Sequence, residues 1–102
     1  MSTSAADTLI EPAASTVSVT DDALIVDLND GRTIIAPLAW YPRLWHGTPE
    51  ERRVVEIIGD GLYLHWPRLD EDLSVSGILA GRPSGESDAS FQRWLATRRR
   101  AG

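Results

Sequence analysis

The sequence contains no cysteine among its 102 residues. A disulfide framework, a cysteine-ligated zinc site and a thiol nucleophile are therefore excluded. No apolar run approaches the roughly 18 residues of a membrane-spanning helix, and residues 1–14 lack the basic and apolar regions of a secretory signal. We therefore expect a cytoplasmic protein with one compact domain, because 102 residues are too few for two.

Lysine is also absent, so all ten basic residues are arginine. Residues 1–83 hold 13 acids and 6 arginines, whereas residues 84–102 hold 4 arginines and 2 acids. An acidic body repels the phosphate backbone, which argues against broad nucleic-acid binding. Only the C-terminal segment keeps that option open.

Alternating apolar residues predict strands in the first half of the chain. Residues 16–20, 23–28 and 33–36 have this pattern, and short turn sequences separate them. Pro37 ends the third strand, because proline cannot donate to a sheet ladder. The pattern predicts an antiparallel three-stranded meander, preceded by a flexible tail over residues 1–14.

Short helices and a second β-hairpin are expected next. A proline inside the helical pattern of residues 38–45 predicts a short or kinked helix. Residues 48–51, Thr-Pro-Glu-Glu, match a helix start with threonine as N-cap and the second glutamate reaching back to it. Residues 54–58 and 62–66 are β-type runs joined by Gly-Asp-Gly, which predicts a hairpin.

The last third of the chain begins with three consecutive acids, interpreted as an acidic loop before a helical turn capped by Asp72 or Ser74. Residues 82–87 form a linker, and residues 88–102 predict an amphipathic helix with a basic end. Its apolar face consists of Phe91, Trp94 and Leu95. The expected fold class is α+β, with a single domain over residues 15–81.

Four blocks of the sequence, residues 30–32, 37–44, 48–52 and 65–81, resemble the bacterial domain-of-unknown-function family 2442. The resemblance implies a small mixed fold, with strands first and a helix before the last hairpin. It implies little about activity, although some members lie beside another short gene in arrangements resembling toxin–antitoxin pairs. Some longer relatives carry a helix-turn-helix domain after this one, which a single terminal helix cannot form.

The stretch from Leu62 to Asp72 concentrates the unusual residues of the chain, and His65 with the Asp70–Asp72 loop suggests a metal-dependent or acid/base enzyme as one alternative. Three consecutive acids point in different directions, however, and no metal-ligand spacing links His46 with His65. Nucleophile and phosphate-binding motifs are absent as well. We therefore expect no catalytic residues, no metal and no cofactor.

Large side chains in this stretch and its neighbourhood have structural interpretations too. Trp40, Trp45 and Trp66 are expected to fill the core of so small a domain, with the lining of a ligand or peptide groove as the alternative. Arg43 and Arg68 are expected to pair with the acids at 70–72, or else to clamp a carboxylate.

The absence of a convergent catalytic set favours a non-catalytic protein-interaction or regulatory module, with an antitoxin-like role as its concrete form. The expected partner is a protein, encoded by a neighbouring gene or a second copy of the chain, and not a membrane. The terminal helix either docks on its own domain or binds a partner, and accessory nucleic-acid binding through Arg98–Arg100 is a third alternative. The candidate interaction surface comprises Trp66, Pro67, Arg68, Asp70, Glu71, Asp72, Phe91, Trp94, Arg98, Arg99 and Arg100.

Overall fold

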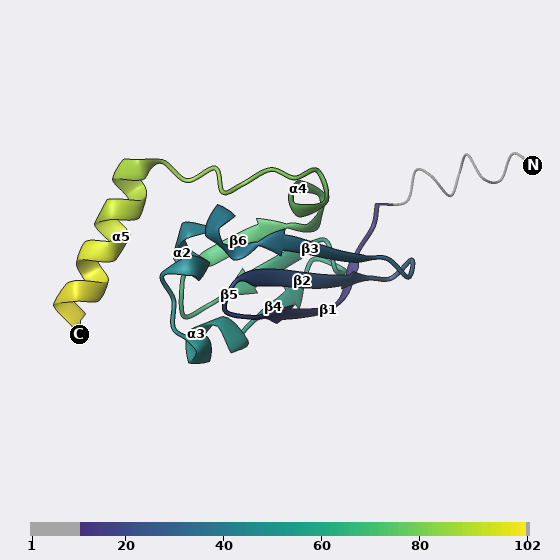
Figure 1. Ribbon diagram of the computed structural model, residues 1–102, viewed down its shortest axis with the longest axis horizontal. Coiled ribbons are helices and arrows are strands. Elements are labelled where there is room, and N and C mark those ends of the chain that lie inside the picture. The colour runs from purple at the N-terminus through teal and green to yellow at the C-terminus, as the bar shows by residue number, and fades with distance from the viewer. Residues whose placement is uncertain (1–10, 102) are drawn as a thin grey trace, which may run out of the picture.

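The first half of the chain forms the predicted meander in this computed structural model, which describes residues 11–101 and the side chains of residues 11–99 (Figure 1). Its strands are β1 (Ala14–Val19), β2 (Ala23–Leu28) and β3 (Thr33–Pro37), paired antiparallel in that order. The Ala23 carbonyl accepts from the Thr20 N–H at 2.9 Å in the first turn. Ala13 and Ala14, assigned to the predicted tail, are buried against the sheet; residues 1–10 of that tail lie outside the described residues.

Two short helical segments and a helix connect the meander to the second sheet: η1 (Leu38–Trp40), α2 (Pro42–Trp45) and α3 (Pro49–Arg53). Pro42 begins α2, because the first helical position does not need a backbone donor. The capping box predicted for α3 is confirmed. The Glu51 N–H donates to Thr48 Oγ1 at 3.1 Å, and the Thr48 N–H donates to Glu51 Oε1 at 2.9 Å.

The second sheet contains the predicted hairpin and one strand that was not predicted. Its order is β4-β5-β6, with β4 (Glu56–Ile58), β5 (Tyr63–Trp66) and β6 (Glu71–Ser74) all antiparallel. The interpretation of residues 70–72 as a loop is wrong for Glu71 and Asp72, which lie in β6. Pairing of Leu73 with Leu64 fixes this strand, and tertiary pairing outweighs the weak β-propensity of acidic residues.

Helix α4 (Val75–Leu79) follows β6 directly, and Ser74 is its N-cap. Ser74 Oγ accepts from the Gly77 N–H at 3.0 Å, which decides between the two caps that the sequence left open. Helix α5 (Asp88–Ala101) ends the described chain and begins at the residue predicted for it. No helix within residues 11–101 is long and apolar enough to cross a membrane.

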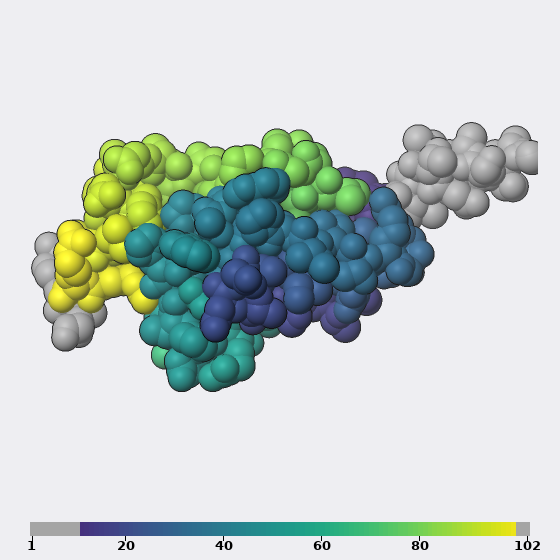
Figure 2. All heavy atoms as spheres, in the orientation of Figure 1, coloured from purple at the N-terminus to yellow at the C-terminus, as the bar shows by residue number. Residues whose placement is uncertain are grey.

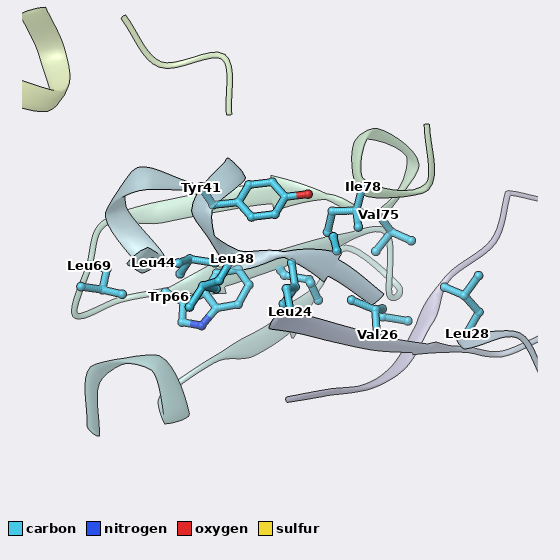
Figure 3. Packing of buried hydrophobic residues seen from close by; sticks show 13 residues of the cluster. Leu24, Val26, Leu28, Leu38, Tyr41, Leu44, Trp66, Leu69, Val75 and Ile78 are labelled. Atoms are coloured by element: carbon cyan, nitrogen blue, oxygen red, sulfur yellow. The ribbon is translucent and has the colours of Figure 1, made fainter. Parts of the chain in front are cut away.

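The hydrophobic core lies between the two sheets and the connecting helices (Figure 3). Leu24 and Val26 of β2 belong to the same buried cluster as Leu64 and Trp66 of β5, and each of these side chains is fully buried. Leu28 of β2 belongs to the cluster as well, and the large members from the connecting segments and α4 are Leu38, Tyr41, Leu44, Leu69, Val75 and Ile78. Because one face of β2 and of β5 is buried in this core, apolar residues alternate with other residues along both strands, and the sequence predicted them.

The expectation for the three tryptophans is confirmed for Trp66 and wrong for the other two. Trp66 is fully buried, whereas Trp40 and Trp45 are 39% and 46% exposed. Both exposed tryptophans lie at the ends of one-turn segments, where a single turn cannot direct every large side chain inward. The core is therefore closed by Tyr41 and Leu44 instead.

Candidate functional site

Large apolar side chains on the β4–β5 hairpin and just before it remain 39–49% exposed in the described chain. Four of them, on both sides of β4, are together called the β4 surface: Val54, Ile57, Ile58 and Tyr63. Ile58 lies directly opposite Tyr63, so the two share the outer face of the sheet. Ile57 lies opposite the buried Leu64 and is nevertheless 39% exposed. Strand β4 is consequently apolar and open to solvent on both faces.

Acidic residues flank the β4 surface. Glu56 and Asp60, one inside β4 and one in the following turn, are both exposed, and Glu50 of α3 is exposed as well. Asp60 has a φ of +57° between two glycines that also have positive φ, so the turn that follows β4 is tight. Arg53, which is also exposed, lies 3.8 Å from the Glu50 carboxylate and offsets its charge. Glu56 and Asp60 are therefore the acids that favour a positively charged binding partner.

The sequence analysis assigned none of these residues to a functional surface, although one pattern could have done so. Ile57 and Ile58 are adjacent, and adjacent residues of a strand point to opposite faces. Only one of the two can therefore face the core of a half-buried sheet. A continuous apolar run in an edge strand is thus an indication of a second, external contact.

The predicted surface around residues 66–72 needs correction, because two of its members are buried. Trp66 is fully buried, and its Nε1–H donates to the Arg52 carbonyl at 3.1 Å. Glu71 lies opposite Trp66 on the core side of the sheet and is 8% exposed. Pro67 and Arg68 are exposed as expected.

The three consecutive acids diverge, as the sequence analysis argued that they must. Asp70 lies in the turn beside Arg43, Glu71 points into the core, and Asp72 faces outward next to His65. His65 Nδ1 lies 2.5 Å from Asp72 Oδ1. Among the described residues, no group of three histidine, aspartate or glutamate side chains converges to hold a metal ion. The pair His65–Asp72 thus has no third partner that would make it a metal centre.

Burial perturbs Glu71 strongly. Desolvation raises the pKa of its carboxyl from 4.5 to about 7, against smaller lowering effects of the Asp72 N–H and the Arg43 charge. Its Oε1 accepts from the Asp72 N–H at 3.1 Å, while its buried Oε2 finds no partner in the part of the chain that the structure describes. Glu71 is therefore a titrating group within the core rather than a surface acid.

Arg43 connects three segments that are distant in the sequence. Its Nε donates to both carboxylate oxygens of Glu86, at 2.9 and 3.1 Å, and its Nη1 donates to the Asp70 carbonyl at 2.9 Å. The expected pairing with the acids at 70–72 is confirmed only weakly, by a 3.7 Å contact with the exposed Asp70 carboxylate. Arg68 forms no ion pair with any residue in the range 11–99.

Arg52 is a buried arginine to which the sequence analysis gave no role. Its Nε donates to the Leu44 carbonyl and its Nη2 to the Trp45 carbonyl, both at 2.8 Å. Arg52 therefore satisfies the last carbonyl groups of α2 and holds α3 against it. The role is structural, and no spacing in the sequence indicates it.

Helix α5 docks on its own domain, which answers a question that the sequence left open. The ring of Trp94 lies between two guanidinium groups, 5.2 Å from Arg43 and 4.7 Å from Arg98. Phe91 contacts the ring of His46 at a centroid distance of 5.2 Å. Figure 2 shows the helix at one end of the molecule, meeting the remainder along one side. Two members of the predicted surface, Phe91 and Trp94, are thus occupied within the chain.

The basic end of α5 is partly neutralised by the same docking. Arg98 donates from Nη1 and Nη2 to the two carboxylate oxygens of Glu51, at 3.0 and 2.8 Å. Glu51 also belongs to the capping box of α3, so one carboxylate fixes both helices. The Arg98 guanidinium lowers the pKa of Glu51 to about 2. Arg99 is exposed, and the side chain of Arg100 lies outside the described residues.

Together the fold and the site define a small α+β protein with two antiparallel sheets, an exposed apolar edge strand and a docked C-terminal helix. The chain belongs to the family described as "Protein of unknown function (DUF2442)", which matches residues 14–84. This confirms the resemblance seen in the sequence.

Two solved structures are similar to this chain. One is the crystal structure of a protein of unknown function from Rhodospirillum rubrum, 34% identical, with a TM-score of 0.67, covering 78% of this chain and 96% of that chain. The other is the solution NMR structure of an uncharacterized protein from Chromobacterium violaceum, 25% identical, with a TM-score of 0.61, covering 84% of this chain and 75% of that chain. No curated protein matches.

Proposed function

We propose that this chain is a non-catalytic protein-interaction module of the cytoplasm, and that the β4 surface is where its partner binds. One observation carries the proposal: all three residues of β4 are exposed, although two of them are isoleucine. Burial of apolar surface against a partner contributes about 25 cal/mol of favourable free energy per Å² removed from water. An edge strand with apolar residues on both faces is also a liability unless another surface covers it.

The partner that fits this surface is a protein with an apolar patch bordered by basic residues. Glu56 and Asp60 would meet those residues, which steers association and penalises acidic competitors. The product of a neighbouring gene is the first candidate, and an antitoxin-like, regulatory role is the concrete form of the proposal. That form rests on the family resemblance, whereas the location of the contact rests on β4.

The test is co-purification of the chain with the products of the adjacent genes, followed by calorimetric titration with each product that is retained. Ile58→Arg should weaken binding at least tenfold, about 1.4 kcal/mol or more, because it places a charge in the middle of the apolar contact. Ile35→Arg is the matched control. Ile35 is 68% exposed on the other sheet, against 42% for Ile58, and its replacement should leave binding unchanged.

Two results would contradict the proposal. The first is a wild-type chain that is monomeric by light scattering and retains neither neighbouring product. The second is equal binding by wild type and Ile58→Arg. If instead the chain dimerises and Ile58→Arg alone makes it monomeric, the partner is a second copy bound through the same surface.

A further inference from the structure

A cavity of about 280 Å³ lies at the free edge of β6, between α4 and the segment that follows it. Tyr41, Leu73 and Ile78 supply apolar atoms to its lining, and the polar lining residues include Asp72, Ser74 and Arg82. None of these residues belongs to the β4 surface, so the cavity is independent of the function proposed above. Its volume is at the lower end of the range for ligand pockets, which restricts the ligand to a small molecule.

The Tyr41 hydroxyl is the first indication of a ligand. Tyr41 is 1% exposed, yet its hydroxyl oxygen has no hydrogen-bond partner within the described chain. Figure 3 shows the hydroxyl directed towards α4, where Ile78, a second lining residue, is located. Buried hydroxyl groups are normally paired, so an unpaired one at a cavity indicates a missing partner. Desolvation raises the pKa of Tyr41, so the phenol stays protonated and can donate.

Arg82 is the second indication. It lines the cavity and forms no ion pair with any of the residues whose side chains are described. Its guanidinium lies against α4, because a Cβ on Gly77 would be in van der Waals contact with Arg82 Nη2, at 3.6 Å. A planar guanidinium with open donors beside an apolar floor matches a carboxylate on an apolar molecule.

We propose that this cavity binds a small α-amino or α-hydroxy acid. The Tyr41 hydroxyl and the Arg82 guanidinium donate to the carboxylate, and the apolar tail lies on Leu73 and Ile78. Asp72 is also a lining residue, and its carboxylate, which pairs with His65 through Oδ1, accepts from the amine or hydroxyl beside the ligand's carboxylate through Oδ2. The ligand therefore needs both groups, because its carboxylate faces hydrogen-bond donors and its amine or hydroxyl faces an acceptor.

The experiment is an NMR titration of the full-length ¹⁵N-labelled chain with a matched series of probes. L-Leucine and L-2-hydroxyisocaproate carry both groups, isocaproate lacks the donor, and leucinamide lacks the carboxylate. We expect one of the first two to shift the amides of Leu73, Ser74, Gly77 and Arg82, with dissociation constants of about 1 mM. Isocaproate and leucinamide should bind at least tenfold more weakly.

Three variants make the result specific. Arg82→Gln and Tyr41→Phe should each weaken binding at least tenfold, whereas Arg68→Gln, a change at an exposed arginine outside the cavity, should not. Tyr41→Phe should leave the melting temperature unchanged or higher, since it removes an unpaired buried hydroxyl; if it fails to fold, Arg82→Gln decides. The proposal is overturned if neither L-leucine nor L-2-hydroxyisocaproate shifts these amides at roughly 20 mM. It is also overturned if isocaproate and leucinamide bind as tightly as these two acids.

Discussion

The core between the two sheets and the contact of α5 with the rest of the domain, which we call the seam, are held by different kinds of interaction. In the core, Leu24, Leu64 and Trp66 are fully buried and contact other apolar side chains. Along the seam, the contacts are the charge pair Arg98–Glu51 and the Trp94 ring between two guanidinium groups. All of the α5 side chains that make these contacts remain partly exposed.

The core and the seam should therefore respond differently to salt and pH. Apolar burial depends little on the screening of charges, so the core should melt cooperatively in most buffers, with a pH dependence that comes from Glu71. Partly exposed ion pairs are screened by salt and contribute less than about 1 kcal/mol each. The seam should therefore open under conditions in which the core stays intact. Four changes in sequence or pH test whether the core and the seam differ in this way.

Trp66→Ala should have the largest effect, because it removes the largest fully buried side chain and the hydrogen bond to the Arg52 carbonyl. We expect a loss of about 3–5 kcal/mol in the free energy of unfolding, measured by chemical denaturation. Trp45→Ala, at a half-exposed tryptophan of α2, is the control and should cost far less. Equal losses for the two variants would show that the core is not where stability resides.

Glu71→Gln should remove a pH dependence from the core. The pKa of Glu71 is raised to about 7 in the folded chain, against 4.5 when unfolded. The folded state thus binds this proton more tightly, and the wild type loses stability as the pH rises from 4.5 to about 7.

The variant should therefore be the more stable protein at about pH 8, by on the order of 1–3 kcal/mol, and lose this advantage below about pH 4.5. Denaturation curves at both pH values measure it. Glu50→Gln, at an exposed glutamate, is the control and should show the same pH dependence as the wild type. A constant difference between Glu71→Gln and the wild type at all pH values would contradict the assignment.

Trp94→Ala should open the seam without unfolding the core, since it removes the ring shared by Arg43 and Arg98. We expect about 1–2 kcal/mol less docking free energy, seen as 5- to 30-fold faster amide hydrogen exchange in α5. Exchange in β2 and β5 should not change. Arg99→Ala, at an exposed arginine of the same helix, serves as control. Unaltered exchange in α5 would mean that Trp94 does not hold the helix.

Acid should have the smallest effect, through the ion pair of Glu51 with Arg98. The pKa of Glu51 is lowered to about 2, so its stabilising contribution is complete above pH 4.5 and is lost as the pH falls towards 2. We expect less than about 1 kcal/mol, visible as a chemical-shift change of the α5 amides. Glu51→Gln should abolish this acid transition, and a transition that persists in the variant would assign it to another group.

Local features of the fold were predictable because neighbouring residues decide them. The α3 capping box needs only Thr48 and Glu51, three residues apart, and the structure forms it as predicted. The turn at 59–61 needs three positive φ values, which Gly-Asp-Gly supplies. The meander also follows from alternation and turn residues alone. In each case the partners lie within a few positions of one another.

The features that the sequence did not predict depend on strand pairing and tertiary packing, which local sequence patterns do not specify. Strand β6 exists because Leu73 meets Leu64, and Glu71 is buried because Trp66 lies opposite it. Arg43 pairs chiefly with Glu86, 43 positions away, and not with the nearer acids. Trp40 and Trp45 are large and apolar, as core residues usually are, yet Tyr41 and Leu44 fill this part of the core instead.

Local sequence patterns account for the elements of this protein other than β6: strands from alternation, caps from hydroxyl and carboxyl spacing, turns from glycine and aspartate. The tertiary structure alone decided which surfaces remain, because exposure depends on how distant segments pack. The two adjacent isoleucines of β4 already required one apolar side chain outside the core. Only the placement of β4 at the edge of its sheet left both of them open to solvent.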